Sequence, residues 1–258
     1  MMNKKVPVII IGGLVVILLV VFVLFKNNES NSNNPNDSKE YSYMIINNES
    51  IWGYNGSWIK SNNSLIDNTN LETYINNVYS GFYTYKLGNV WNLFDGNNLI
   101  TYDGLLIGFS KNLGRVININ KVDIDSNDLN VINGILNKSI GIDDINKYEK
   151  VNIDLDNNGI MDSIIYVTNI MDEELNSYFS LLYVVFNGSV YVLKNDDVTN
   201  DNFYEEPLYS IKAVVDINGK SVNNIIIEKG YFSNVNKTGN IMYQYNKDSK
   251  KYEIVIQD

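Results

Sequence analysis

From Tyr41 to the end of the chain, short runs rich in valine, isoleucine and tyrosine alternate with turn signals, and this pattern constrains the fold most strongly. Such runs are typical of β-strands, and Asn-Gly or Asp-Gly pairs between them are typical of hairpin turns. The predicted turns are Asn55–Gly56 (with Trp52 and Trp58 on its flanks), Gly88–Asn89, Asp95–Gly96, Asn187–Gly188 and Asp248–Ser249. The sequence therefore predicts a mainly β domain of antiparallel hairpins with a few short helices, which is an α+β class.

Two segments have the spacing of amphipathic helices instead. In the first, Thr69 and Glu72 match a capping box, and Gly81 is placed to end the helix. The apolar stripe of this predicted helix consists of Leu71, Tyr74, Ile75, Val78 and Tyr79. In the second, Ser126 caps a helix with an apolar face of Leu129, Ile132, Ile135 and Leu136.

Residues 6–25 form an uncharged apolar run. At about 1.5 Å per residue, a helix of this length spans about 30 Å, the thickness of the hydrocarbon core of a bilayer. The run ends at Phe25 and Lys26 without a small-residue cleavage site, which favours an uncleaved anchor over a removable signal peptide. We therefore expect a cytoplasmic tail at residues 1–5, a transmembrane anchor at 6–25, a disordered asparagine-rich tether at 26–40 and an extracellular β-rich domain at 41–258.

Charge sets the expected orientation and excludes one class of partner. Lys4 and Lys5 precede the apolar run and favour a cytoplasmic N-terminus, so we expect a single-pass protein of the cell membrane. The chain has 30 acidic and 20 basic residues, for a net charge of −10. Because such a surface repels phosphates, nucleic acid is not an expected partner.

The chain contains no cysteine and no histidine. This composition excludes disulfides, thiolate nucleophiles, Ser-His-Asp triads and zinc sites built from thiolate or imidazole. A metal would have to be bound by oxygen atoms, which points to calcium or magnesium. Proton transfer would depend on carboxylates, lysine or tyrosine.

The sharpest chemical feature is the stretch NIDLDNNGIMDSIIYV at residues 152–167. Oxygen-bearing side chains alternate along it, and Gly159 permits a sharp bend that brings them around one point. The predicted calcium ligands are Asp154, Asp156, Asn158, the backbone carbonyl of Ile160, and Asp162. An EF-hand is excluded because Ile165 occupies the position of its final glutamate. An ordinary polar turn between two strands is the alternative interpretation.

The stretch VNIDLDNNGIMDSIIYV, residues 151–167, resembles the calcium-binding hairpins of the integrin-type FG-GAP and VCBS repeat families. The resemblance implies hairpins that bind calcium within propeller-like or curved antiparallel repeats. A degenerate second copy covers residues 213–231 and aligns Asp216, Asn218 and Asn224 with Asp154, Asp156 and Asp162. Lys220 and Ser221 replace the third ligand and the glycine, so we expect this second loop to hold no metal. DIDSNDLNVI, from Asp123, is a superficial third match that reads better as a helix cap.

These features favour a membrane-anchored extracellular binding module without catalytic activity, stabilised by one structural calcium ion. Its partner would be an extracellular protein or a glycan. The alternative is a carboxylate-based glycan hydrolase of the cell envelope, which needs two acidic residues across a cleft. The candidate acids for this alternative are Asp172, Glu173, Glu174, Asp196, Asp197, Glu205 and Glu206, each of which also reads as part of a solvated loop.

Overall fold

The computed structural model describes residues 41–47, 49–61, 66–87, 91–169, 178–198, 207–231 and 238–258. These residues form a mainly β structure with one α-helix, and its strands pair antiparallel in three open sheets. Within the described residues, no helix is long and apolar enough to span a membrane. The predicted tail, anchor and tether at residues 1–40 lie outside the described residues.

Sheet A has the strand order β3-β2-β1-β8-β4-β5-β6-β7. Its strands are β1 (Ser42–Ile46), β2 (Ser50–Tyr54), β3 (Trp58–Lys60), β4 (Thr69–Ile75), β5 (Val78–Leu87), β6 (Trp91–Asp95), β7 (Asn98–Ile100) and β8 (Leu106–Ser110). The predicted turns at Asn55–Gly56 and Asp95–Gly96 join β2 to β3 and β6 to β7, which confirms both hairpins. The predicted turn at Gly88–Asn89 lies outside the described residues.

The other two sheets have five strands each. Sheet B, of order β18-β17-β16-β15-β9, contains β9 (Gly114–Ile117), β15 (Pro207–Ile217), β16 (Asn224–Tyr231), β17 (Gly239–Asn246) and β18 (Lys251–Gln257). Sheet C, of order β10-β11-β12-β13-β14, contains β10 (Asn120–Val122), β11 (Lys147–Ile153), β12 (Asp162–Thr168), β13 (Tyr178–Phe186) and β14 (Ser189–Val198). The predicted hairpins at Asn187–Gly188 and Asp248–Ser249 are confirmed as β13–β14 and β17–β18.

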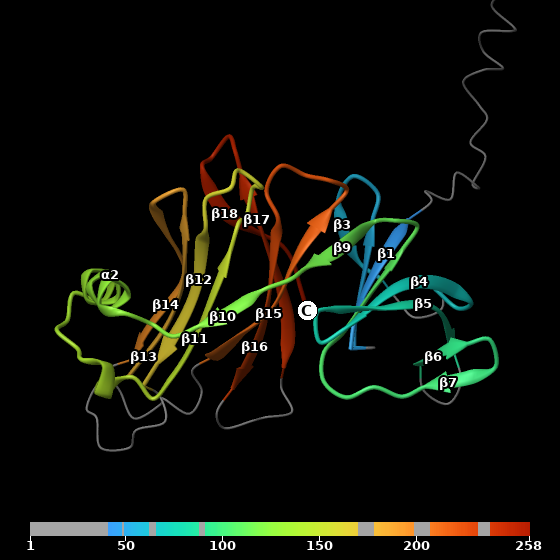
Figure 1. Cartoon of the computed structure of the whole chain (residues 1–258), viewed down its shortest axis with the longest axis horizontal. Coiled ribbons are helices and arrows are strands. Elements are labelled where there is room, and N and C mark those ends of the chain that lie inside the picture. The colour runs from blue at the N-terminus through green and yellow to red at the C-terminus, as the bar shows by residue number, and fades with distance from the viewer. Residues whose placement is uncertain are drawn as a thin grey trace, which may run out of the picture. The chain divides into compact units, whose positions relative to one another are not determined.

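Sheet B lies between the other two sheets, and the helix α2 (Ser126–Leu136) covers the far side of sheet C (Figure 1). Val214 and Ile225 of sheet B pack with Ile164 and Leu182 of sheet C. The opposite face of sheet B packs against sheet A through Ala213, Val215 and Ile226, which meet Met44, Ile46 and Phe109. Because the inner strands β12 and β13 of sheet C are buried on both faces, their sequences contain the continuous apolar runs 164–167 and 181–186.

The prediction of a helix that begins near Thr69 and ends at Gly81 is wrong, because this segment forms strands β4 and β5. Asn76 and Asn77 make the turn between them with φ of 51° and 66°, a left-handed conformation that asparagine tolerates. Both faces of β4 are covered, with Leu71 on one side and Tyr74 on the other. Apolar residues therefore occur on both faces of the hairpin, and their spacing imitates that of a helix.

The second predicted helix is confirmed as α2. Its N-cap is Asp125 rather than Ser126, and the Asp125 carboxylate accepts the N–H groups of Asn127 and Asp128. Ile132 and Leu136 of the predicted apolar face are buried against sheet C. A short 3₁₀ turn, η2 (Ile142–Asp144), follows.

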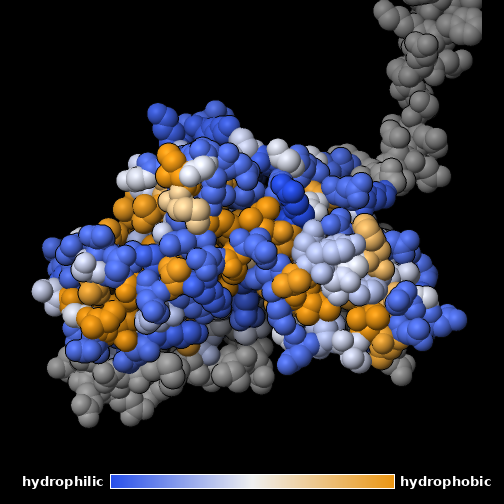
Figure 2. Space-filling view, viewed as in Figure 1, coloured by the Kyte–Doolittle hydropathy of each residue, from blue (hydrophilic) through white to orange (hydrophobic). Residues whose placement is uncertain are grey.

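Polar side chains surround several separate groups of apolar side chains on the face shown in Figure 2. The exposed large apolar side chains of the described residues include Val78, Tyr79 and Phe82 of β5, Leu99 of β7, and Ile160 and Met161 of the β11–β12 loop. Apolar exposure on this surface is therefore local rather than spread over one continuous face.

Candidate metal centre and its surroundings

The predicted metal loop joins β11 to β12 at one end of sheet C. Ile153 pairs with Asp162 in the register of this hairpin, so residues 154–161 form the connection. Ile153 and Leu155 are buried in the core shared by sheets B and C, which fixes the base of the loop. Asn157 and Gly159 have φ of 58° and 85°, which are the left-handed conformations that close the bend.

Asp154 is held from inside the loop. Its two carboxylate oxygens accept the N–H groups of Asn158 at 3.0 Å and Gly159 at 2.7 Å. Although burial raises the pKa of the Asp154 carboxyl, backbone donors from Gly159 and the neighbouring residues lower it more, so the net shift is downward. The first predicted ligand is therefore a fixed, ionised carboxylate.

Asp162 is the most deeply placed acid of the loop, with only 2% of its surface exposed. Its oxygens accept the N–H groups of Leu155 and Asn187, each at 2.9 Å. Burial raises the pKa of the Asp162 carboxyl, the N–H groups of Asn187 and Leu155 offset part of this rise, and the negative charges of Asp156 and Asp154 add to it, so the net shift is upward. A cation near the loop would therefore favour the ionised form of this carboxylate.

Asp154, Asp156 and Asp162 converge, because each offers one carboxylate oxygen within 4.8 Å of the others. One oxygen of Asp156, Oδ1, is buried and has no hydrogen-bond partner. A cation bound between the three carboxylates would supply the interaction that this oxygen lacks and would offset their mutual repulsion. The residues present thus fit a hard, oxygen-binding ion.

The other two predicted ligands, Asn158 and Ile160, lie on the same loop with different surroundings. The side-chain oxygen of Asn158 accepts the N–H of Ile160 at 2.7 Å, and its amide donates to Asn187 at 2.8 Å. The side chain of Ile160 is a hydrocarbon and is 58% exposed, so only the backbone carbonyl of this residue can act as a ligand. Asn158 and the Ile160 carbonyl remain predicted ligands, while the three aspartates form the arrangement that the structure brings together.

Asn187 is a residue of this centre that sequence reasoning did not identify. It belongs to the β13–β14 turn, and its N–H donates to Asp162. Its side-chain amide donates to Asp156 at 3.1 Å, while its carbonyl oxygen accepts from Asn158. The Asn-Gly pair predicted only a turn, because contact between two hairpins becomes visible only once the strand order is known.

Replacing Asn187 by glycine is expected to loosen the loop without straining the turn. Glycine accepts the φ of 49° at this position but removes two side-chain hydrogen bonds to Asp156 and Asn158. We expect the free energy of unfolding to fall by about 1–2 kcal/mol and calcium affinity to fall about tenfold. Urea unfolding and calcium titration measure the two effects.

The matched control is Asn218→Gly, at a left-handed turn position of the second loop, with φ of 57°. We expect this control to leave calcium affinity unchanged. Equal losses of affinity in Asn187→Gly and Asn218→Gly would mean that Asn187 does not position the ligands.

The second, degenerate loop has the same place in its hairpin as the first. Val215 pairs with Asn224 in β15–β16, as Ile153 pairs with Asp162 in β11–β12. The Lys220 ammonium lies 3.4 Å from the side-chain oxygen of Gln244 and 5.5 Å from the ring centre of Tyr54. The backbone repeat is thus preserved, while the position aligned with Asn158 carries a cation that contacts neighbouring strands.

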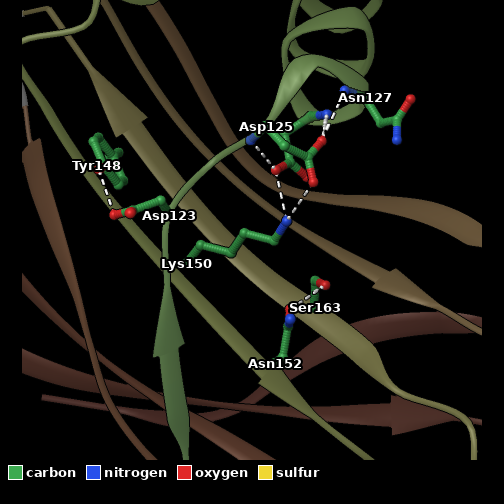
Figure 3. Close-up of polar contacts among 8 residues, drawn as sticks. Asp123, Asp125, Asn127, Tyr148, Lys150, Asn152 and Ser163 are labelled. Carbon is green, nitrogen blue, oxygen red and sulfur yellow. Dashed lines mark hydrogen bonds and ion pairs between the residues drawn. The ribbon is translucent and has the colours of Figure 1, made fainter.

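The third match, from Asp123, is a helix cap. Figure 3 shows Lys150 reaching from β11 to the acids at the start of α2, beside the contact between Tyr148 and Asp123. The Lys150 ammonium lies 2.6 Å from Asp128 and 3.4 Å from Asp125. These acids are therefore engaged in fastening α2 to sheet C.

Of the acids considered for a hydrolase, Asp172, Glu173, Glu174, Glu205 and Glu206 lie outside the described residues, as does the side chain of Asp197. Asp196 accepts a hydrogen bond from the hydroxyl of Tyr209 at 3.1 Å. Comparison of the chain with protein-family models, curated proteins and solved structures finds no match.

Proposed function

We propose that residues 41–258 form a non-catalytic interaction module, anchored in the cell membrane by residues 6–25 and stabilised by one calcium ion in the β11–β12 loop. The single observation that carries the calcium assignment is the convergence of Asp154, Asp156 and Asp162, which each offer one carboxylate oxygen within 4.8 Å of the others. The buried Oδ1 of Asp156, which has no hydrogen-bond partner, supports it. Calcium suits this loop better than magnesium, because it accepts irregular sets of six to eight oxygens whereas magnesium demands a near-ideal octahedron.

The ion would act by joining segments that are distant in the sequence. Asn187 links the loop to the β13–β14 turn, and the N–H of Asn223 donates to the carbonyl of Leu155 at 2.8 Å, which links it to β15–β16. Neutralising the three carboxylates would therefore stabilise the contact between sheets B and C. A role in stability, rather than in catalysis, follows from this position.

We also propose that β11–β14 and β15–β18 are two copies of one four-stranded unit. The equal register of their first hairpins supports this, as does the separation of 62 residues between Asp154 and Asp216. The face-to-face packing of sheets B and C is the relation that neighbouring propeller blades have. These observations support the resemblance to FG-GAP and VCBS hairpins as an explanation of the repeated loop.

Terbium luminescence tests the ion site in the full-length chain. Burial raises the pKa of the Tyr252 hydroxyl, and the charges of Asp162 and Asp156 raise it further, which indicates that Tyr252 lies near the loop. Its ring can therefore sensitise a lanthanide bound there. We expect terbium emission on tyrosine excitation, displacement by calcium, and loss of the signal in Asp162→Asn. Emission that survives in Asp162→Asn and resists calcium would contradict the site.

Protease accessibility tests the membrane arrangement separately. In intact cells, we expect added protease to cleave the tether and release a soluble fragment containing the β domain. Protection of the domain in intact cells, with cleavage only after lysis, would reverse the proposed orientation.

A further inference from the structure

One face of sheet A is only partly covered by sheet B. Glu72 and Tyr74 of β4 lie directly opposite Phe82 and Tyr79 of β5, and directly opposite residues share a face. Tyr74 is 8% exposed and contacts Phe109 in the core between the sheets. Tyr79 and Phe82, on the same face, are 52% and 63% exposed. Sheet B therefore covers this face of sheet A as far as β4 and leaves β5 exposed. We call the surface at this boundary the step.

The floor of this step is aromatic. The ring centres of Tyr74 and Tyr79 are 5.7 Å apart, and those of Tyr79 and Phe82 are 6.3 Å apart. A bulge in the pairing of β5, between the partners of Thr73 and Tyr74, allows Tyr79 and Phe82 to share a face although they are three positions apart. The bulge thus builds a row of rings from the core out to solvent.

The wall of the step is the edge of sheet B. Strand β9 is the edge strand there, and it carries Arg115, whose Nε lies 3.3 Å from Asp216. An open cleft of about 270 Å³ runs along this edge and is lined by Glu72, Asn112, Gly114, Arg115, Asp216, Asn218 and Gly219. Glu72 accepts the Tyr74 hydroxyl at 2.7 Å, so the polar cleft and the aromatic row meet at this pair.

We propose that this step binds an uncharged glycan, with sugar rings on Tyr79 and Phe82 and sugar hydroxyls in the cleft. This inference rests on the proposed role of the chain as an interaction module and names its binding surface. A sugar has an apolar C–H face that suits exposed rings, and its hydroxyls both donate and accept hydrogen bonds. The cleft offers both kinds of partner, since Arg115 donates, Glu72 accepts, and the amides of Asn112 and Asn218 do both.

The charges of the cleft favour a neutral ligand. Arg115 is 63% exposed and is paired with Asp216, while Glu72 lies nearby. A strongly anionic ligand would face two carboxylates, and a strongly cationic ligand would face the guanidinium. An uncharged, hydroxyl-rich ligand meets neither penalty.

Calorimetric titration of the full-length chain, in a detergent without a sugar head group, tests this proposal with soluble chito-oligosaccharides as the probe. We expect saturable binding that Tyr79→Ser and Phe82→Ser each weaken about tenfold, the effect of losing one aromatic contact. The matched control is Leu99→Ser, which removes a 51% exposed side chain from β7 of the same sheet and is expected to change nothing. Arg115→Gln provides a cleft variant that leaves the aromatic row intact and is expected to weaken binding.

Three results would overturn the proposal. The first is no binding of the wild-type chain to chito-oligosaccharides, and the second is equal affinity in Tyr79→Ser, Phe82→Ser and wild type. The third is tighter binding of an acidic probe, oligogalacturonate. If sedimentation shows that Tyr79 and Phe82 join two copies of the chain and no sugar binds, the proposal is overturned in the same way as by the first result. The calcium assignment would survive each of them, because terbium luminescence judges it independently.

Discussion

Calcium at about one hundred times its dissociation constant is expected to raise the midpoint of thermal unfolding of the full-length chain by about 5–10 °C. Binding to the folded state alone at that concentration contributes about 2.7 kcal/mol. Each kcal/mol shifts the midpoint of a domain of this size by about 2–4 °C. The physical reason is the cluster of Asp154, Asp156 and Asp162, whose repulsion and unpaired oxygen an ion would relieve. Circular dichroism melts with calcium and with chelator measure the shift.

Variants of the cluster separate this effect from a general effect of salt. We expect Asp154→Asn and Asp162→Asn to lose the calcium-dependent shift. Asp248→Asn, at an exposed hairpin turn far along the chain, is the matched control and should keep it. If the melts in calcium and in chelator coincide for the wild-type chain, the loop is an ordinary polar turn.

Lys150→Met is expected to lower the free energy of unfolding by about 3–5 kcal/mol, because it leaves a buried carboxylate without its cation. Lys150 and Asp128 have side chains that are 8% and 11% exposed, and their charged atoms are 2.6 Å apart. Asp128 also accepts the N–H of Asp125 as part of the capping box, so the same carboxylate serves the helix and the ion pair. Urea unfolding followed by circular dichroism measures the loss.

Two further variants give this prediction its controls. Lys147→Met removes a lysine from the same strand whose side chain is 44% exposed, and it should change the free energy of unfolding by less than about 0.5 kcal/mol. Adding Asp128→Asn to Lys150→Met removes the uncompensated charge and should recover most of the stability. A Lys150→Met variant as stable as Lys147→Met would show that the ion pair does not fasten α2.

The same ion pair predicts a dependence on alkaline pH. Burial lowers the pKa of the Lys150 ammonium, but Asp128 and then Asp125 raise it by more, so the folded pKa lies above the ordinary value. Its contribution is therefore complete below the unfolded pKa of about 10.4 and is lost as pH rises through the folded pKa. The difference in unfolding free energy between wild type and Lys150→Met should stay constant from about pH 7 to about pH 9, begin to shrink as pH passes the unfolded pKa, and finish shrinking as pH passes the folded pKa. A difference that shrinks already between pH 7 and 9 would contradict this origin.

Sequence patterns predicted the hairpins where the turn itself carries a signal. Asn187–Gly188 has φ of 49° and 74°, the conformation that an Asn-Gly pair favours, and the strands on either side pair as expected. Asn76–Asn77 makes a similar left-handed turn, but the capping pattern at Thr69 and Glu72 obscured it. The segment forms a hairpin and not a helix because both faces of β4 are buried by the rest of the fold. The local sequence alone did not distinguish these two structures.

Local sequence patterns did not predict which strands pair within each sheet. Strand β9 joins sheet B beside β15, about a hundred residues later in the chain, while β10 joins sheet C. Nothing in the short runs around Arg115 or Lys121 encodes these partners, because strand pairing depends on long-range burial. The aromatic row at Tyr79 and Phe82 follows from the same cause, since exposure there depends on where sheet B ends.

For the metal loop too, local sequence predicted one part of the arrangement and missed another. The alternation of Asp154, Asp156 and Asp162 with the bend at Gly159 predicted that their carboxylates converge, and the three oxygens lie within 4.8 Å of one another. The part played by Asn187 was missed, because it comes from a neighbouring hairpin and depends on the pairing of β12 with β13.

Equilibrium dialysis of the full-length chain against calcium, with bound metal counted per chain, tests the central claim most directly. We expect one calcium ion per wild-type chain at saturation and none in Asp162→Asn, with the Asp248→Asn control binding as wild type does. Wild-type chain that retains no more calcium than Asp162→Asn would contradict the account, and the converging aspartates would then be a polar turn.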